Sequence, residues 1–208
     1  MKELTLDVFR QMLQRALTHI EERQAEFSQL DAVLGDGDHG TAMVTAMKAI
    51  VGTAATNEGF KTMLNDMGFN VMLQTSGSTS TLLGAFFLGM SDHVDGMSLD
   101  AAAVKKMFAG GLKNVCTQTQ AKKGDKTMMD ALIPAVEAIE EIQSDNIGEI
   151  LSAGAAAAQA GADRTNGMVA AFGRARNYGS RSVGSPDAGA KSWACMFSAF
   201  AEAVNSKG

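Results

Sequence analysis

Apolar residues recur at intervals of three and four positions along the chain, which is the repeat of one buried face of an α-helix. Such sets comprise Leu6, Phe9, Leu13, Ala16, Leu17 and Ile20; Met43, Met47, Ile50, Val51 and Ala54; Met63, Leu64, Met67, Val71 and Met72; Leu82, Leu83, Phe86, Phe87 and Met90; Val104, Met107, Phe108 and Leu112; Met129, Leu132, Ile133, Val136 and Ile139; Ile147, Ile150 and Leu151; and Trp193, Met196, Phe197, Phe200 and Val204. No strand pattern competes with them. The chain is therefore predicted to be all-α, with about eight helices in one domain over residues 1–208.

Several helix ends can be predicted from single residues. Ser98 and Asn146 are expected N-caps, because their side chains can accept hydrogen bonds from free N–H groups of the first turn. Pro134 falls inside an apolar set, so that helix either starts late or kinks there. The first helix is expected to end near Asp31, and a glycine-rich segment follows it.

Composition excludes several classes of protein. With 46% hydrophobic and 20% charged residues, the chain is not of the disordered type, and a net charge of −5 argues against a general nucleic-acid binder. The residues after Met1 include Glu3 and lead into an amphipathic pattern, and no window approaches 18 apolar residues, so neither export nor a membrane span is expected. Cys116 and Cys195 are read as free thiols, and a cytoplasmic location is expected.

Three aspartates gather among glycines in residues 31–41, which read DAVLGDGDHGT. Asp36 and Asp38 flank Gly37, so a folded-back loop can aim both carboxylates at one point, and Asp31 can close the ring. Like charges this close repel one another unless a cation lies among them. Because carboxylate oxygens are hard ligands, the segment predicts a site for Mg²⁺ or Ca²⁺.

Other interpretations of this segment fit less well. An EF-hand that began at Asp36 would need glutamate where Met47 stands. The glycines spell GxGxxG, but that dinucleotide fingerprint must follow a strand, and a helical pattern precedes it here. A solvated acidic turn without metal stays an alternative. The metal site is favoured because three aspartates, three glycines and a helix start coincide.

The start of the next helix adds a second attraction for a polyphosphate. Backbone N–H groups near His39–Ala42 lack acceptors within the helix and can bind phosphate oxygens, helped by the helix dipole. Together with carboxylates that hold Mg²⁺, they would form a polyphosphate site. His39 either points at that ligand or serves as a cap or core residue.

Three further loops adjoin predicted helix ends. Residues 75–81, TSGSTST, are either a second phosphate loop or ordinary helix caps. In GDKT, at 124–127, Lys126 either reaches a phosphate or helps to cap a helix, and the fragment lacks the upstream glycine of a Walker loop. The long loop 173–190 carries Arg174 and two further arginines, which can hold an acidic ligand or partner.

At these loops the sequence resembles the nucleotide-binding L subunit, or DAK2-type domain, of dihydroxyacetone kinase. The matching elements are Leu30-Asp31 followed by GDGDHG at 35–40, GDKTM at 124–128, GRA at 173–175 and RSVGSPDAGA at 181–190. They occur in family order across almost the whole chain. The resemblance implies a barrel of eight antiparallel helices.

The resemblance also implies roles for individual residues. Two Mg²⁺ ions would be held by Asp31, Asp36 and Asp38. The nucleotide, ADP or ATP, would be contacted by His39, Gly40, Thr41, Ala42, Ser78, Thr79, Thr119, Met128, Arg174, Asp187, Ala188 and Gly189. No catalytic side chain is assigned. The chain departs from the family where Ser80-Thr81 replaces Gly-Pro in the phosphate loop and Ala188 replaces a proline.

The resemblance implies a phosphotransferase subunit that passes a terminal phosphoryl group to dihydroxyacetone or a related small ketose. The ketose would sit on a separate K subunit, and resident ADP would be rephosphorylated by a phosphohistidine carrier protein of the phosphotransferase system. Neither nucleic acid nor membrane is an expected partner, and a homodimer stays open. The alternatives are a regulatory nucleotide-binding subunit, an ATP-dependent kinase subunit for another ketose such as a tetrulose, and a Mg²⁺-dependent phosphohydrolase.

Overall fold

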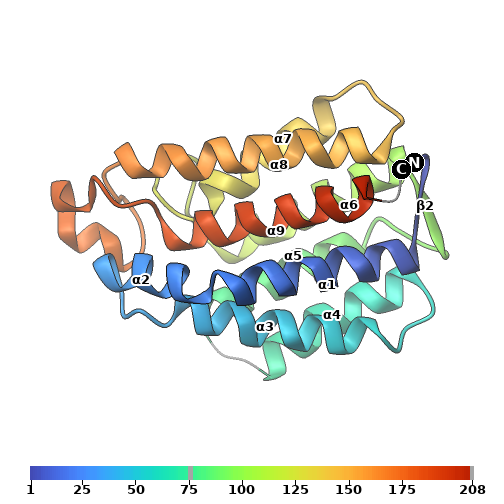
Figure 1. Ribbon diagram of the computed structural model, residues 1–208, viewed down its shortest axis with the longest axis horizontal. Coiled ribbons are helices and arrows are strands. Elements are labelled where there is room, and N and C mark those ends of the chain that lie inside the picture. The colour runs from blue at the N-terminus through green and yellow to red at the C-terminus, as the bar shows by residue number, and fades with distance from the viewer. Residues whose placement is uncertain (75–76, 207–208) are drawn as a thin grey trace.

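The computed structural model describes residues 1–74 and 77–206, and helices account for most of them (Figure 1). The α-helices are α1 (Leu6–Glu22), α2 (Gln24–Leu34), α3 (His39–Ala54), α4 (Phe60–Gln74), α5 (Ser78–Ser91), α6 (Ala101–Gln118), α7 (Met129–Glu141), α8 (Ile147–Arg164) and α9 (Ala188–Asn205). Two 3₁₀ segments follow α8: η1 (Thr165–Gly167) and η2 (Arg174–Ser182). The all-α prediction is confirmed.

The helices form a closed ring. Helix α1 packs against α3, and each later helix packs against the next in chain order until α9 returns to α1. Within the described residues the ring has eight helices, α1 and α3 to α9, as the hydrophobic pattern predicted. Helix α2 lies outside the ring and packs across the ends of α3 and α9. Figure 1 shows the N-terminus and the last turn of α9 at one end of the ring, with α2 and η2 at the other.

Glycines and aromatic rings set how closely the helices of the ring approach. A Cβ at Gly89 of α5 would collide with the backbone of Gly110 in α6, and the reverse holds for Gly110, so the two helices meet backbone to backbone. Around this contact, Phe86 packs edge-on against Trp193, with ring centroids 5.2 Å apart. The rings of Phe108 and Phe197 complete an aromatic cluster in the core. Such edge-to-face pairs stabilise the core beyond the area that they bury.

Two predicted helix starts have different outcomes. The side chain of Asn146 accepts a hydrogen bond from Gly148 N, so this predicted cap is confirmed. The Ser98 prediction is wrong, because Asp100 caps α6 by accepting from Ala103 N. Ser98 instead belongs to strand β2 (Ser98–Asp100), which pairs antiparallel with β1 (Glu3–Thr5). Strands this short do not give an alternating pattern in the sequence.

Two helices also run differently from the sequence expectation. The first predicted helix is two helices separated at Arg23, and Asp31 lies in the second of them. Helix α7 begins at Met129 and includes Pro134, so it does not start late. Proline cannot donate to the carbonyl of Asp130, and a Cβ at Gly161 of α8 would collide with that same carbonyl. Helix α8 therefore packs closely where α7 lacks a backbone hydrogen bond.

No helix among the described residues is both long enough and apolar enough to cross a membrane.

Candidate functional site

A pocket of about 640 Å³ opens at the end of the ring where α2 and η2 lie. Its walls come from the turn between α2 and α3, the start of α5, the segment between α6 and α7, and residues 172–189. These segments are far apart in the sequence and meet only because the ring closes. The volume lies within the range of small-molecule and cofactor sites.

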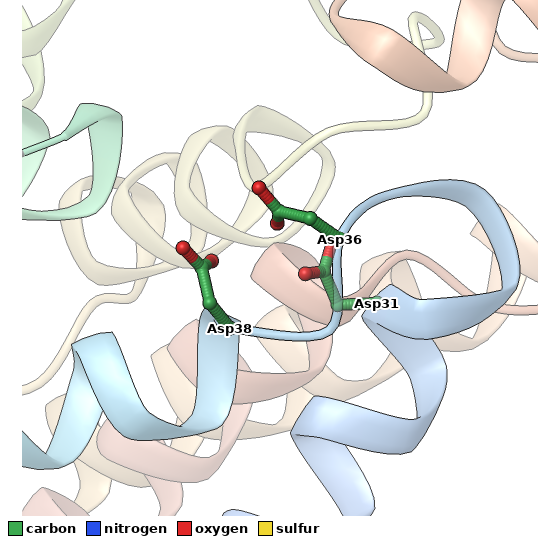
Figure 2. A group of neighbouring side chains, drawn as sticks. All are labelled: Asp31, Asp36 and Asp38. Carbon is green, nitrogen blue, oxygen red and sulfur yellow. The ribbon is translucent and has the colours of Figure 1, made fainter.

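The three predicted metal ligands meet at this pocket. One carboxylate oxygen from each of Asp31, Asp36 and Asp38 lies within 4.8 Å of the other two, and all three residues line the pocket. Figure 2 shows the side chains coming from the end of α2, the following turn and the start of α3. No other such group of metal-binding side chains occurs in the described parts of the chain.

The turn between α2 and α3 is closed by Asp31 itself. Its Oδ2 accepts hydrogen bonds from Gly37 N at 2.8 Å and from His39 N at 3.4 Å. Gly37 has φ +79°, which a residue with a side chain rarely adopts, and a Cβ at Gly35 would collide with the Asp31 carboxylate. Both glycines are thus required for the fold of the turn, and the fold brings the carboxylates together.

The electrostatics of the cluster favour a cation. The hydrogen bond from Arg174 lowers the pKa of Asp36, so this carboxylate stays charged. Partial burial and the charges of Asp36 and Asp31 raise the pKa of Asp38. A divalent cation would relieve this repulsion, and the oxygen donor set fits Mg²⁺.

Three helix N-termini face the same pocket. Lining residues include Asp38 and His39 at the start of α3, Ser78 and Thr79 at the start of α5, and Ala188 and Gly189 at the start of α9. The N-cap residues of α3 and α5, Asp38 and Gly77, make no side-chain hydrogen bond to the first turn of their helices. Helix N-termini attract anions through their N–H groups and dipoles, which suits phosphate. Thr75 and Ser76 of the predicted phosphate loop lie outside the described residues.

His39 joins the three helix starts. Its Nε2 lies 2.8 Å from Ser192 Oγ, and its Nδ1 lies 3.3 Å from Thr79 Oγ1. Ser192 Oγ also donates to Gly189 O, so it accepts from Nε2–H, and Nδ1 is left to accept from the Thr79 hydroxyl. Burial lowers the pKa of His39, which agrees with this neutral ring. Ser192 was not predicted as a site residue, because its position follows the core pattern of α9.

Most of the other predicted nucleotide residues also line the pocket. Thr119 and Met128 do so from the segment between α6 and α7, and Arg174 and Asp187 do so from residues 172–189. Gly40, Thr41 and Ala42 do not. Gly40 is buried, and a Cβ there would collide with the Gln24 carbonyl, while the Thr41 hydroxyl accepts from Gln24 Nε2 at 3.1 Å. Their predicted role therefore rests on the backbone of α3 alone.

The structure also changes the view of residues that the sequence left open. The Lys126 ammonium donates to the carbonyls of Thr165 and Ser185 inside the protein. Trp193 lines the pocket although its apolar set indicated only a core position, and Phe172, for which no role was predicted, lines it as well. At the Ser80-Thr81 departure, Thr81 N donates to Gly77 O at 3.2 Å, a bond that proline cannot make. Ala188 begins α9, where either alanine or proline fits.

Comparisons with known proteins identify the family and the fold. The model of the DAK2 domain matches residues 33–202. The chain is 30% identical over 182 residues to "PEP-dependent dihydroxyacetone kinase 1, ADP-binding subunit DhaL" of Listeria innocua, covering 86% of this chain and 87% of that one. The corresponding subunit of Escherichia coli is 31% identical, with 78% and 80% covered.

Longer proteins match as well. "L-erythrulose 1-kinase" of Mycolicibacterium smegmatis is 32% identical over 87% of this chain, which spans 33% of that protein. Among solved structures, the dihydroxyacetone kinase of C. freundii in complex with AMP-PNP and Mg²⁺ gives a TM-score of 0.71 at 26% identity. The match covers 93% of this chain and 33% of that one.

Proposed function

The chain belongs to the DAK2 domain family, and from this we propose that it is the nucleotide-binding subunit of a kinase for dihydroxyacetone or a related small ketose. Residues 1–208 act as one DhaL-type unit that holds ADP or ATP with Mg²⁺. The observation that carries the proposal is the convergence of three carboxylates and three helix N-termini on one pocket. That combination suits a nucleotide that would be held together with Mg²⁺.

Each part of the pocket has a distinct task in phosphoryl transfer. Asp31, Asp36 and Asp38 would hold two Mg²⁺ ions, and the metal would supply charge neutralisation at the phosphates. The N–H groups at the starts of α3 and α5 bind phosphate oxygens. Arg174 exchanges its contact with Asp36 for one with the nucleotide, since Arg174 and Asp36 both line the pocket. Catalysis then depends on position and electrostatics rather than on a nucleophilic side chain.

Relatives of about the same length as this chain indicate the phosphoryl donor and the partner proteins. They are named as PEP-dependent or PTS-dependent ADP-binding subunits, and this chain covers most of their length. In this proposal the chain keeps ADP bound, receives a phosphoryl group from a phosphohistidine carrier protein, and passes that group to a ketose on a K subunit. The protein works in the cytoplasm.

A tetrulose is the second candidate acceptor. Relatives named as erythrulose kinases are 31% to 32% identical to this chain, as similar as the dihydroxyacetone kinase subunits. The chain spans only about a third of those longer proteins. Since the ketose is held by the partner, the acceptor is decided outside this pocket.

Native mass spectrometry of the purified chain tests the nucleotide and metal parts of the proposal. The expected mass includes one ADP and two Mg²⁺ ions, and denaturation should release the nucleotide. A wild-type chain that neither retains ADP nor binds added Mg-ADP would overturn the proposed function. Activity on dihydroxyacetone and erythrulose, after reconstitution with the K subunit, then distinguishes the two acceptors.

A further inference from the structure

The side chain of Lys126 lines the pocket but is buried, with 1% of its surface exposed. Its Nζ donates to Thr165 O at 2.5 Å and to Ser185 O at 2.6 Å. These carbonyls belong to segments 39 and 59 positions further along the chain. One ammonium group thus joins the turn before α7, the segment after α8 and the segment before α9.

The two partner segments fix the start of α9. The Thr165 hydroxyl accepts from Asp187 N at 2.9 Å and donates to Ala162 O at 2.6 Å. The carboxylate of Asp187 in turn caps α9 by accepting from Ala190 N at 2.7 Å. Because Ser185 is two residues before Asp187, the position of this helix start depends on both partners of the ammonium.

The turn that carries Lys126 is held just as firmly. Asp130, with 2% of its surface exposed, accepts from Gly124 N at 2.5 Å and from Thr127 N at 2.9 Å. Lys126 has φ +62°, a left-handed conformation that disfavours a residue with a side chain. Such backbone strain persists where the surrounding structure holds it in place.

Charge accounts for the burial of an ammonium group here. Burial lowers the pKa of Lys126, while the nearby carboxylates of Asp187 and Asp130 raise it. Burial also disfavours the charged form of Asp187 and raises its pKa to about 6, and the charge of Lys126 opposes that rise. Buried charges persist only with partners, so each of these groups stabilises the charged form of the other.

We infer that Lys126 is a positioning residue of the nucleotide site, which joins the 124–128 turn to the start of α9 and so sets the spacing between Met128 and Gly189. These two residues are pocket neighbours: a Cβ built at Gly189 would lie 3.3 Å from the Cβ of Met128. The role of Lys126 is thus structural support of the nucleotide contacts, not phosphate binding. This inference rests on the proposed function.

The test compares Mg-ADP affinity among folded variants by calorimetry, well below their melting temperatures. Lys126→Met keeps the length of the side chain and removes the ammonium. It is expected to raise the dissociation constant by about tenfold, the effect of one net hydrogen bond to a charged group. Val104→Ala is the control, since Val104 is fully buried in α6 and does not line the pocket. It should lower the melting temperature with no change in affinity.

A second pair of variants tests the same connection from its other end. Thr165→Val removes the acceptor for Asp187 N, whereas Thr165→Ser retains it. Thr165→Ser should bind Mg-ADP about tenfold more tightly than Thr165→Val. If Lys126→Met does not fold, this pair decides the question.

The outcomes separate the inference from the function on which it rests. Wild-type affinity in folded Lys126→Met, or equal affinity in the two Thr165 variants, overturns the positioning role alone. Absence of Mg-ADP binding by the wild-type chain overturns the proposed function and the inference together. A loss of affinity in Val104→Ala as large as that in Lys126→Met also overturns the inference, because affinity would then follow general stability.

Discussion

The guanidinium of Arg174 donates a hydrogen bond to the carboxylate of Asp36, although the two residues are 138 positions apart in the sequence. Both side chains are partly exposed at the mouth of the pocket, so the pair itself adds little to stability. Its importance lies in position. The arginine of the 173–190 segment reaches the predicted metal ligands and covers the place where phosphates would lie.

Replacement of Arg174 by alanine should weaken Mg-ADP binding more than replacement of Arg181. Arg174 lines the pocket. Arg181 does not line the pocket, and its guanidinium carbon lies 5.7 Å from the centroid of the Tyr178 ring. Loss of a charge-assisted contact to phosphate predicts an affinity drop of about tenfold or more for Arg174→Ala. Calorimetry on both variants checks this, and because each loses one positive charge from η2, equal affinities would contradict the role of Arg174.

Asp36→Asn and Asp38→Asn should each abolish Mg²⁺-dependent ADP binding, because each removes a charged ligand from a cluster of three. The free protein should stay folded, since removal of one like charge relieves repulsion. Calorimetry with Mg-ADP and circular dichroism measure the two effects. Asp7→Asn is the matched control, because Asp7 is exposed on α1 and does not line the pocket. Wild-type affinity in both site variants would refute the metal assignment.

Bound nucleotide should stabilise the fold, because only the folded chain brings the pocket together. At Mg-ADP about 100-fold above its dissociation constant, the expected gain in unfolding free energy is about 2.7 kcal/mol. Thermal melts with Mg-ADP should shift upward, and EDTA should remove the shift. An equal shift with ADP and EDTA would argue against bridging by metal ions.

Ser192→Ala should destabilise the protein by about 1–3 kcal/mol, because the Nε2–H of the half-buried His39 loses its acceptor. Denaturant unfolding of the ligand-free protein measures this effect. Ser198→Ala, on the same helix, provides the comparison, since the Ser198 hydroxyl reaches only the exposed Glu202 at 3.3 Å. Similar stability of the two variants would mean that the bond between His39 and Ser192 contributes little.

The donor can be identified by turnover. A resident ADP predicts that the chain, combined with its K subunit and a ketose, turns over many times only when the phosphohistidine carrier is present. Slow release of ADP is expected, since the proposed metal ions, the helix N-termini and the 173–190 segment would all hold it. Fast turnover on added ATP without the carrier would instead indicate an ATP-dependent kinase subunit.

Much of the fold follows from local pattern. The apolar stripes predict the helices of the ring because a helix must bury one face, and Asn146 marks a start that the structure confirms. Positions governed by a single backbone detail were harder to predict. Arg23 separates α1 from α2 without a glycine or proline to indicate the break, and Asp100 rather than Ser98 caps α6 because β2 occupies the residues before it.

By itself the sequence determined the clustering of three carboxylates, because Asp31, Asp36 and Asp38 and the glycines between them form one local turn. The tertiary structure decided everything that requires distant segments to meet. Trp193 carries the same apolar signal whether it faces core or pocket, and only the closed ring brings it to the pocket wall. Likewise, no residue near Lys126 in the sequence indicates that its ammonium donates to distant carbonyls. The carbonyls of Thr165 and Ser185 reach it because α8 and α9 pack side by side, and long-range packing of this kind leaves no periodic mark in the sequence.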